Sequence, residues 1–160
     1  MKKTRVEYFL RVAKAVASAS KCTRRRFGAI LVKNGDIIST GYNGSIRGAI
    51  NCGTGSAIGC IKNLWKEDHY TSYVHCPAIH AEHNACLNAG RPLALGSTMF
   101  LSKSSGDGMS GPPCQGCRRV MIQSGIKDMF YYSTDGEIAH DFVKDWIKLE
   151  NEWIRNESTR

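Results

Sequence analysis

The chain has 160 residues, of which 42% are hydrophobic and 22% charged, and its formal net charge is +8. These values are ordinary for a soluble globular protein, and no apolar run reaches the roughly 20 residues that span a bilayer. We therefore expect one domain over residues 1–160, with no membrane contact. The positive charge should attract anions, and nucleotides, nucleic acids or a merely basic surface all fit it.

The N-terminus gives no sign of export. It begins Met-Lys-Lys, but Arg5, Glu7 and Arg11 interrupt any apolar segment, so we expect no signal peptide and a cytoplasmic protein. Seven cysteines in such a chain favour metal binding or catalysis over disulfides, and an odd number also fits pairing poorly.

In the first half of the chain, apolar spacing predicts a helix over residues 4–20 and short strands over 27–32 and 37–42. Asn34 and Gly35 lie between the strands and form the strongest two-residue hairpin signal, so the pair should be antiparallel. Residues 41–45 form a loop of small residues, where backbone can approach a ligand closely. Residues 46–78 show no periodicity, which is uncommon in a compact domain unless something ties the segment down.

In the second half, helices and strands alternate. We expect strands over 98–101 and 128–132 and helices over 81–89, 114–124 and 139–153. Gly90 and Gly125 should end the first two helices. In the last helix we expect His140 in solvent, and Trp146 and Trp153 in a packed face. The alternation predicts a layered α/β domain whose later strands are parallel.

Three metal-binding side chains stand at the starts of two expected helices. His80 precedes one helix, and Cys114 and Cys117 begin another. Residues three apart share a helical face, so both sulfurs can reach one metal. One imidazole and two thiolates suit a catalytic zinc, which keeps its fourth position for water and lowers the pKa of that water to near neutral. Glu82, two residues after His80, is the expected catalytic base.

Each of these pieces is weakly specific when it stands alone. A Cys-x-x-Cys pair is more often structural than catalytic, and His-x-Glu by itself carries almost no information. Together, with Pro113 before the first cysteine, they form H-x-E…P-C-x-x-C, the signature of zinc nucleobase deaminases. The predicted chemistry is hydrolytic deamination, in which Glu82 takes a proton from water and passes it to a ring nitrogen and then to the leaving amine.

Residues 80–85 (His-Ala-Glu-His-Asn-Ala) and 113–117 (Pro-Cys-Gln-Gly-Cys) resemble the cytidine/deoxycytidylate deaminase superfamily. Gly-Tyr-Asn-Gly at 41–44, Cys-x-Arg at 22–24 and residues 28–32 narrow the resemblance to members that act on deoxycytidylate (dCMP). The resemblance runs from about Cys22 to Tyr132. It implies hydrolysis of dCMP to dUMP and ammonia on a three-layer α/β/α, cytidine-deaminase-like fold with a five-stranded mixed sheet.

The same resemblance implies a homohexamer that dCTP activates and dTTP inhibits, with Mg²⁺ accompanying the triphosphate effector. The chain departs from the family's pattern at Ile46, where members usually carry proline. It also departs in the loop 104–111, which is longer than expected.

Four further cysteines fall in or beside the segment without periodicity: Cys22, Cys52, Cys60 and Cys76. Together they would make a structural zinc site that stabilises this segment. By resemblance, Cys76 occupies the place where members with a second zinc carry a ligand. His69 or His75 could replace one cysteine, and free thiols are the alternative. We interpret Cys86 as a core residue.

Substrate contacts rest on the resemblance and on charge. Asn43 would hydrogen-bond the sugar, although an asparagine that only builds a turn is the alternative. A 5′-phosphate requires cations, and Arg26 and Lys103 are preferred to Arg24 and Arg25, although a solvated basic face explains the arginines as well. Tyr131 and Tyr132 end a predicted strand, and one of them, with Tyr132 preferred, would stack near the base, although alternate strand residues are more often core. The resemblance alone suggests these effector contacts: Tyr42, Gly44, Ser45, Arg47 and Asn84.

Two other functions fit part of the pattern. A deaminase of tRNA adenosine shares both motifs and suits the charge, but the Gly-Tyr-Asn-Gly loop and the cysteine-bearing segment disfavour a nucleic-acid partner. An inactive, zinc-stabilised nucleotide sensor is the second alternative. Glu82 disfavours it, because a structural zinc has no use for this carboxyl group.

Overall fold

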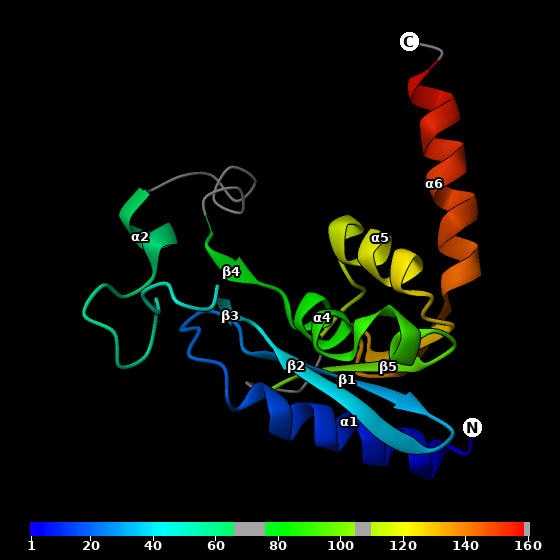
Figure 1. Ribbon diagram of the computed structural model, residues 1–160, viewed down its shortest axis with the longest axis horizontal. Coiled ribbons are helices and arrows are strands. Elements are labelled where there is room, and N and C mark those ends of the chain that lie inside the picture. Colours follow the sequence, from blue (N-terminus) through cyan, green and yellow to red (C-terminus); the bar gives the residue numbers. More distant parts are fainter. Residues whose placement is uncertain (66–75, 105–109, 159–160) are drawn as a thin grey trace.

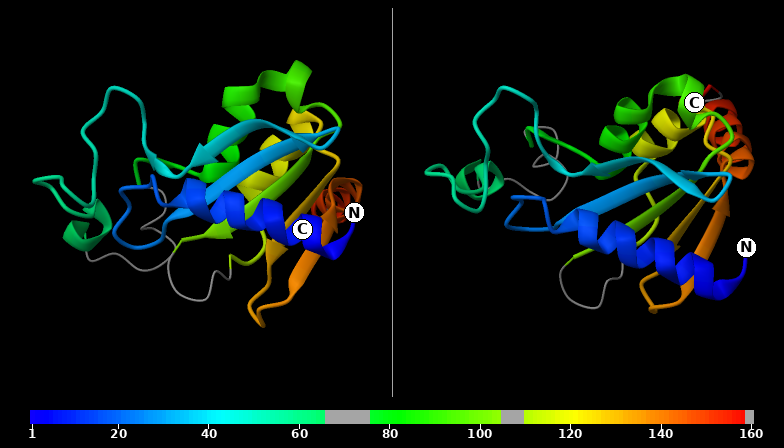
Figure 2. Two further views of the ribbon diagram at one scale, coloured as in Figure 1. Left: turned by 90° about the horizontal axis from the view of Figure 1, so that it is seen from below. Right: turned by 60° about the horizontal axis from the view of Figure 1, so that its bottom comes forward.

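A computed structural model describes residues 1–65, 76–104 and 110–158. Its centre is a sheet of five strands in the order β2-β1-β5-β6-β7. The strands are β1 (Phe27–Lys33), β2 (Asp36–Tyr42), β5 (Thr98–Lys103), β6 (Asp128–Tyr132) and β7 (Ile138–Phe142). Helix α1 (Lys3–Ala17) covers one face, and α4 (Ala81–Ala94) and α5 (Gln115–Ser124) cover the other (Figures 1 and 2). The predicted α/β/α layering is confirmed.

Each face of the sheet has its own apolar core because side chains alternate along a strand. Phe9 and Leu10 of α1 pack with Phe100 and other residues on one face. Ala85 of α4 and Met121 of α5 belong to the cluster on the other face. The predicted hairpin joins β1 to β2, and Asn34 and Gly35 have the positive φ values, 54° and 93°, that such a turn requires.

Strand directions bring three chain segments to one edge of the sheet. β1 is antiparallel to β5, whereas β5 and β6 are parallel. The start of β1 therefore lies beside the carboxyl ends of β5 and β6, and we call the edge at Phe27, Lys103 and Tyr132 the site edge. In doubly wound α/β folds, ligands bind beyond the carboxyl ends of parallel strands.

The last helix begins four residues later than predicted. Residues 138–142 form β7, antiparallel to β6, and α6 (Val143–Glu157) follows. The His140 ring stacks on Phe130 with 4.0 Å between centroids, and its Nε2 lies 3.1 Å from Asp128 Oδ2. His140 thus lies in a strand rather than at a helix start, so that part of the prediction is wrong, whereas its expected exposure to solvent is confirmed. Pairing with β6 overrides the local helical pattern, and the parallel prediction holds only for β5 and β6.

The expected helix ends are confirmed. Gly90 adopts φ 66° and interrupts α4, and Gly125 caps α5 with φ 76°. Trp146 is buried in the core, whereas Trp153 is 47% exposed. α6 packs beside α5 and projects beyond it (Figure 1). None of the helices in the described ranges is long and apolar enough to cross a membrane.

Between β2 and α4 the chain forms three short elements, β3 (Gly44–Ser45), α2 (Ile61–Trp65) and β4 (Ala78–Ile79). β3 and β4 pair antiparallel and lead into α4. Gly41 allows the first turn of α4 to lie against β2, since a Cβ there would be 2.3 Å from the Ala85 nitrogen and 2.4 Å from the Ala81 oxygen. This close approach positions the start of α4 at the site edge.

Candidate active site

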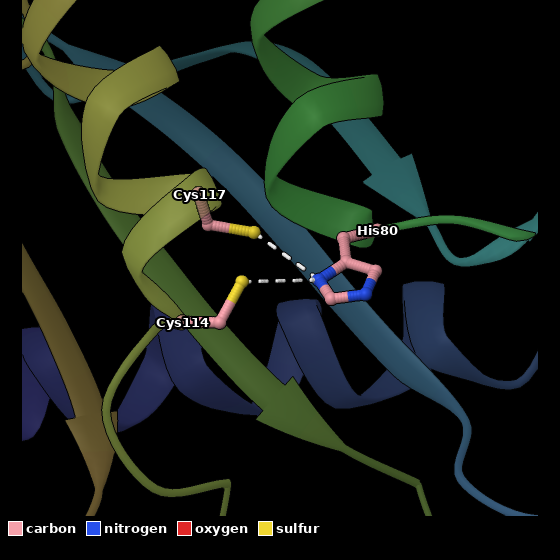
Figure 3. Close-up of side chains that lie close together, drawn as sticks. All are labelled: His80, Cys114 and Cys117. Carbon is pink, nitrogen blue, oxygen red and sulfur yellow. Dashed lines mark hydrogen bonds between the residues drawn. The ribbon is translucent and has the colours of Figure 1, made fainter. Parts of the chain in front are cut away.

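Two helix N-termini converge at the site edge. His80 is the N-cap residue of α4, and Cys114 is that of α5. His80 Nδ1 lies 3.2 Å from Cys117 Sγ and 3.6 Å from Cys114 Sγ, and the imidazole faces both sulfurs (Figure 3). Across residues 1–65, 76–104 and 110–158, this is the single set of three such ligands whose donor atoms all lie within 4.8 Å of one another.

The separations fit one zinc ion. Zinc bonds of roughly 2.0–2.1 Å to nitrogen and 2.3 Å to sulfur, at a tetrahedral angle, place the two donor atoms about 3.6 Å apart. The observed 3.2 and 3.6 Å agree with that spacing. Three protein ligands with a fourth position left over is the arrangement of a catalytic zinc, and the predicted site at His80, Cys114 and Cys117 is confirmed.

One of the three ligands carries the negative charge that attracts a cation. Hydrogen bonds with Cys117 and His80 lower the pKa of the exposed Cys114 thiol to about 3. Cys117 is buried, and its hydrogen bond to Cys114 together with that burial raises its pKa. The hydrogen bond with Cys114 raises the pKa of His80. Cys114 is therefore a thiolate at neutral pH, next to helix N-termini that favour negative charge.

Glu82 lies beside these ligands in the first turn of α4. Its side chain is only 6% exposed, and this burial raises the pKa of the carboxyl group, while a hydrogen bond with Cys117 opposes the rise. A carboxyl group whose pKa is raised holds a proton more readily, so it can both accept and donate a proton during one reaction. The structure thus brings together the predicted base and the predicted ligands.

The Asn43 side chain hydrogen-bonds backbone groups at the site edge. Its Nδ2 donates to the Arg25 carbonyl at 2.9 Å, and its Oδ1 accepts from the Phe27 amide at 2.8 Å. These contacts are those of an asparagine that shapes a turn. Each amide atom keeps one further hydrogen-bonding position, so the sugar contact stays a prediction.

Arg26 and Lys103 lie near each other at the site edge. Phe27 pairs with Lys103, and the Ser104 amide donates to the Arg26 carbonyl at 3.0 Å. The Arg26 guanidinium holds the Cys22 carbonyl and the Thr54 hydroxyl. Tyr132, however, packs with the cluster on the α1 face of the sheet, the opposite face from α4 and α5.

The five predicted effector contacts gather where β2 meets α4. Asn84 Nδ2 donates to the Tyr42 carbonyl at 2.8 Å, and Arg47 Nη2 donates to Asn88 Oδ1 at 3.1 Å. Gly44 and Ser45 form β3 directly after Tyr42. All five therefore lie in or beside the end of β2, β3 and the first turns of α4.

The four further cysteines are half-buried, unpaired thiols. The Thr54 amide donates to the Lys21 carbonyl at 2.8 Å, so the segments that carry Cys22 and Cys52 run side by side. No three of the four meet within 4.8 Å in the described part of the chain. His69 and His75, the suggested replacements, lie outside the described residues. Cys86 is buried in the core, as predicted.

Two residues near the site were not predicted. The positive charge of Lys62 in α2 opposes the rise in the pKa of His80, which places this lysine near the ligands. Arg118 in α5 hydrogen-bonds the Pro113 carbonyl just before Cys114. Neither residue belongs to a motif or a periodic pattern, and only the folded chain identifies them.

Comparison with known proteins adds an independent finding. Residues 3–133 match the family described as "Cytidine and deoxycytidylate deaminase zinc-binding region". The deoxycytidylate deaminase of Mycobacterium phage D29 is 34% identical over 130 residues, covering 78% of this chain and 91% of that protein. The family match over residues 3–133 contains every site residue discussed above and ends before β7 and α6.

Solved structures share the fold. The crystal structure of dCMP deaminase from the cyanophage S-TIM5 in apo form has a TM-score of 0.60 at 27% identity, covering 85% of this chain and 89% of that chain. The same enzyme in complex with dCMP and dUMP has a TM-score of 0.56 at 27% identity, covering 79% of each chain. The five-stranded mixed sheet with helices on both faces is thus shared with these proteins.

Proposed function

This chain belongs to the cytidine and deoxycytidylate deaminase family, and from that premise we propose that it hydrolyses dCMP to dUMP and ammonia. The observation that carries the proposal is the buried Glu82 carboxyl group next to the His80, Cys114 and Cys117 set. Relatives named deoxycytidylate deaminase support the choice of dCMP, and one similar enzyme was crystallised with dCMP and dUMP.

Zinc, when bound, supplies Lewis acidity that lowers the pKa of water to near neutral. Glu82 then accepts a proton from the attacking water and delivers it to the ring nitrogen next to C4 of the cytosine. A new C–O bond forms at C4, and Glu82 then carries the proton of the resulting hydroxyl group to the amino group. The C–N bond breaks, ammonia leaves and a carbonyl group remains at C4. Burial suits Glu82 to this shuttle because it raises the pKa of the carboxyl group.

We propose that the nucleotide lies along the site edge. Asn43 contacts the sugar through the free positions of its amide, and Arg26 and Lys103 bind the 5′-phosphate from neighbouring strand ends. Tyr132 as a base contact is proposed from the sequence, and its side chain packs on the α1 face of the sheet. A mononucleotide rather than a nucleic acid is the proposed partner.

A second, structural zinc at Cys22, Cys52, Cys60 and Cys76 also belongs to the proposal. The adjacency of the segments that carry Cys22 and Cys52 supports it, and so do the unpaired thiols. Their separations here require the segment to tighten around the metal. Such tightening is common in sites that fold with zinc.

We further propose that dCTP with Mg²⁺ activates the protein and dTTP inhibits it, in a cytoplasmic homohexamer. The surface formed by Tyr42, Gly44, Ser45, Arg47 and Asn84 adjoins the first turn of α4, which carries Glu82. An effector bound there would act directly on the position of Glu82, the catalytic base. Unpaired cysteines support a reducing compartment.

The test is ammonia release from dCMP, dCTP, deoxycytidine and CMP, each with and without dCTP or dTTP, with a tRNA anticodon stem-loop alongside. We expect dCMP to have the highest kcat/KM and dCTP to raise it. A rate on the stem-loop that exceeds the rate on dCMP would replace the proposal with a polynucleotide deaminase. No release from any nucleotide by zinc-loaded protein would favour the nucleotide sensor.

A further inference from the structure

One arginine holds the backbone that presents a zinc ligand. Arg118 Nε donates a hydrogen bond of 3.1 Å to the carbonyl oxygen of Pro113, the residue before Cys114. Pro113 is buried, whereas Cys114 is exposed at the N-cap of α5, where its own side chain makes no capping hydrogen bond. The Pro113 carbonyl belongs to the peptide group that joins Cys114, so anchoring it restricts the rotation that would swing the Cys114 sulfur away.

Arg118 is in turn held by the C-terminal part of the chain. Its guanidinium lies over the Trp146 ring of α6, 5.5 Å from the centroid. Trp146 Nε1 donates to Asp141 Oδ2 at 3.3 Å, and the Tyr131 hydroxyl donates to the same oxygen at 3.3 Å. Asp141 and Trp146 belong to β7 and α6, beyond the family match that ends at residue 133. A segment outside the shared family region thus contacts the side chain that holds the Pro113 carbonyl.

We propose that Arg118 is a positioning residue that fixes Cys114 for zinc through its hydrogen bond to the Pro113 carbonyl. Partners of this kind, one step removed from the metal, typically account for 10- to 100-fold in metal affinity or activity. The proposal rests on the zinc site alone and not on the identity of the substrate.

The chain contains its own control. Arg119, the next residue, also stacks on a tryptophan of α6, with its guanidinium 5.5 Å from the Trp153 centroid, and it pairs with Glu150. These contacts link α5 to α6 without the Pro113 carbonyl. If Arg118 acted only by joining the two helices, replacing Arg119 would have a similar effect on zinc binding.

The experiment compares Arg118→Met, Arg118→Gln and Arg119→Met with the unmodified protein. Glutamine carries an N–H donor at the same number of bonds from Cα as Arg Nε, whereas methionine has no donor there. All three residue types have similar helix propensity, so α5 itself should persist. The readouts are the zinc dissociation constant by chelator competition, the cobalt–thiolate absorption after Co²⁺ replacement, and urea unfolding of the metal-free protein.

We expect Arg118→Met to weaken zinc binding about tenfold or more and to shift the cobalt–thiolate band. Arg118→Gln should stay within about threefold of the unmodified protein, and Arg119→Met should match it. The proposal is overturned if Arg118→Met binds zinc normally, if Arg118→Gln is as weak as Arg118→Met, or if Arg119→Met weakens zinc equally. No substrate is used, so the outcome does not depend on whether dCMP is deaminated.

Discussion

Glu82 is buried, as suits a residue that transfers protons, and it is not one of the three zinc ligands. Its carboxyl group is nearly inaccessible to solvent, and the three ligands already satisfy the protein's share of a catalytic zinc site. Glu82→Gln keeps the size and hydrogen-bonding capacity of the side chain but cannot accept the proton.

We predict that Glu82→Gln lowers kcat for dCMP by about 10²- to 10⁴-fold, the usual contribution of general acid–base catalysis, and leaves the zinc content unchanged. Steady-state ammonia release and elemental analysis measure the two quantities. Glu152→Gln, at an exposed position of α6, is the control and should change neither. Loss of zinc from Glu82→Gln would show that this residue is a ligand.

Asn43 combines a demonstrated structural contact with a proposed substrate contact. Asn43→Ala removes the partners of the Phe27 amide and the Arg25 carbonyl, so we predict a loss of about 1–3 kcal/mol in the free energy of unfolding. If the residue also binds the sugar, KM for dCMP should rise as well. Urea denaturation and steady-state kinetics separate the two effects, and lower stability with an unchanged KM would leave Asn43 as a turn residue only.

At the scale of elements, α6 has a buried half and an exposed half. Trp146 is 5% exposed and reaches the core beneath α5, whereas Trp153 is 47% exposed. Removing a fully buried aromatic side chain costs lost burial and leaves a cavity. The spacing of the two tryptophans puts them on the same face of the helix, yet the fold buries only Trp146.

Trp146→Ala should therefore lower the free energy of unfolding by about 3–5 kcal/mol, and Trp153→Ala by well under half of that amount. Urea unfolding of the zinc-loaded protein, followed by circular dichroism, measures both variants. Equal losses would mean that the outer half of α6 is covered in solution, as a subunit interface would cover it.

At the scale of the whole molecule, the number of bound zinc ions tests the segment between β2 and α4. We predict close to two zinc ions per chain by elemental analysis, and close to one after Cys22→Ser. Cys86→Ser is the matched control, because Cys86 lies in the core and should leave the count at two. One zinc ion in the unmodified chain would remove the structural site.

The chemistry of the site can be predicted from the amino-acid sequence. His80, Glu82 and the Cys114–Cys117 pair are local patterns, because ligand type and helical spacing decide which atoms can meet at one metal. Helix ends at Gly90 and Gly125 and the hairpin at Asn34 were equally predictable, since each depends on the backbone freedom of one or two residues.

Features that depend on contacts between distant parts of the chain could not be predicted in this way. Residues 138–142 form a strand because they pair with the edge of β6. This pairing outweighs their local helical pattern. The face of the sheet on which the Tyr132 side chain lies follows from the strand register, and a register shift of one residue would move this side chain to the opposite face. Arg118 meets Pro113 and Trp146 through contacts between elements, and neither spacing nor composition reports such contacts.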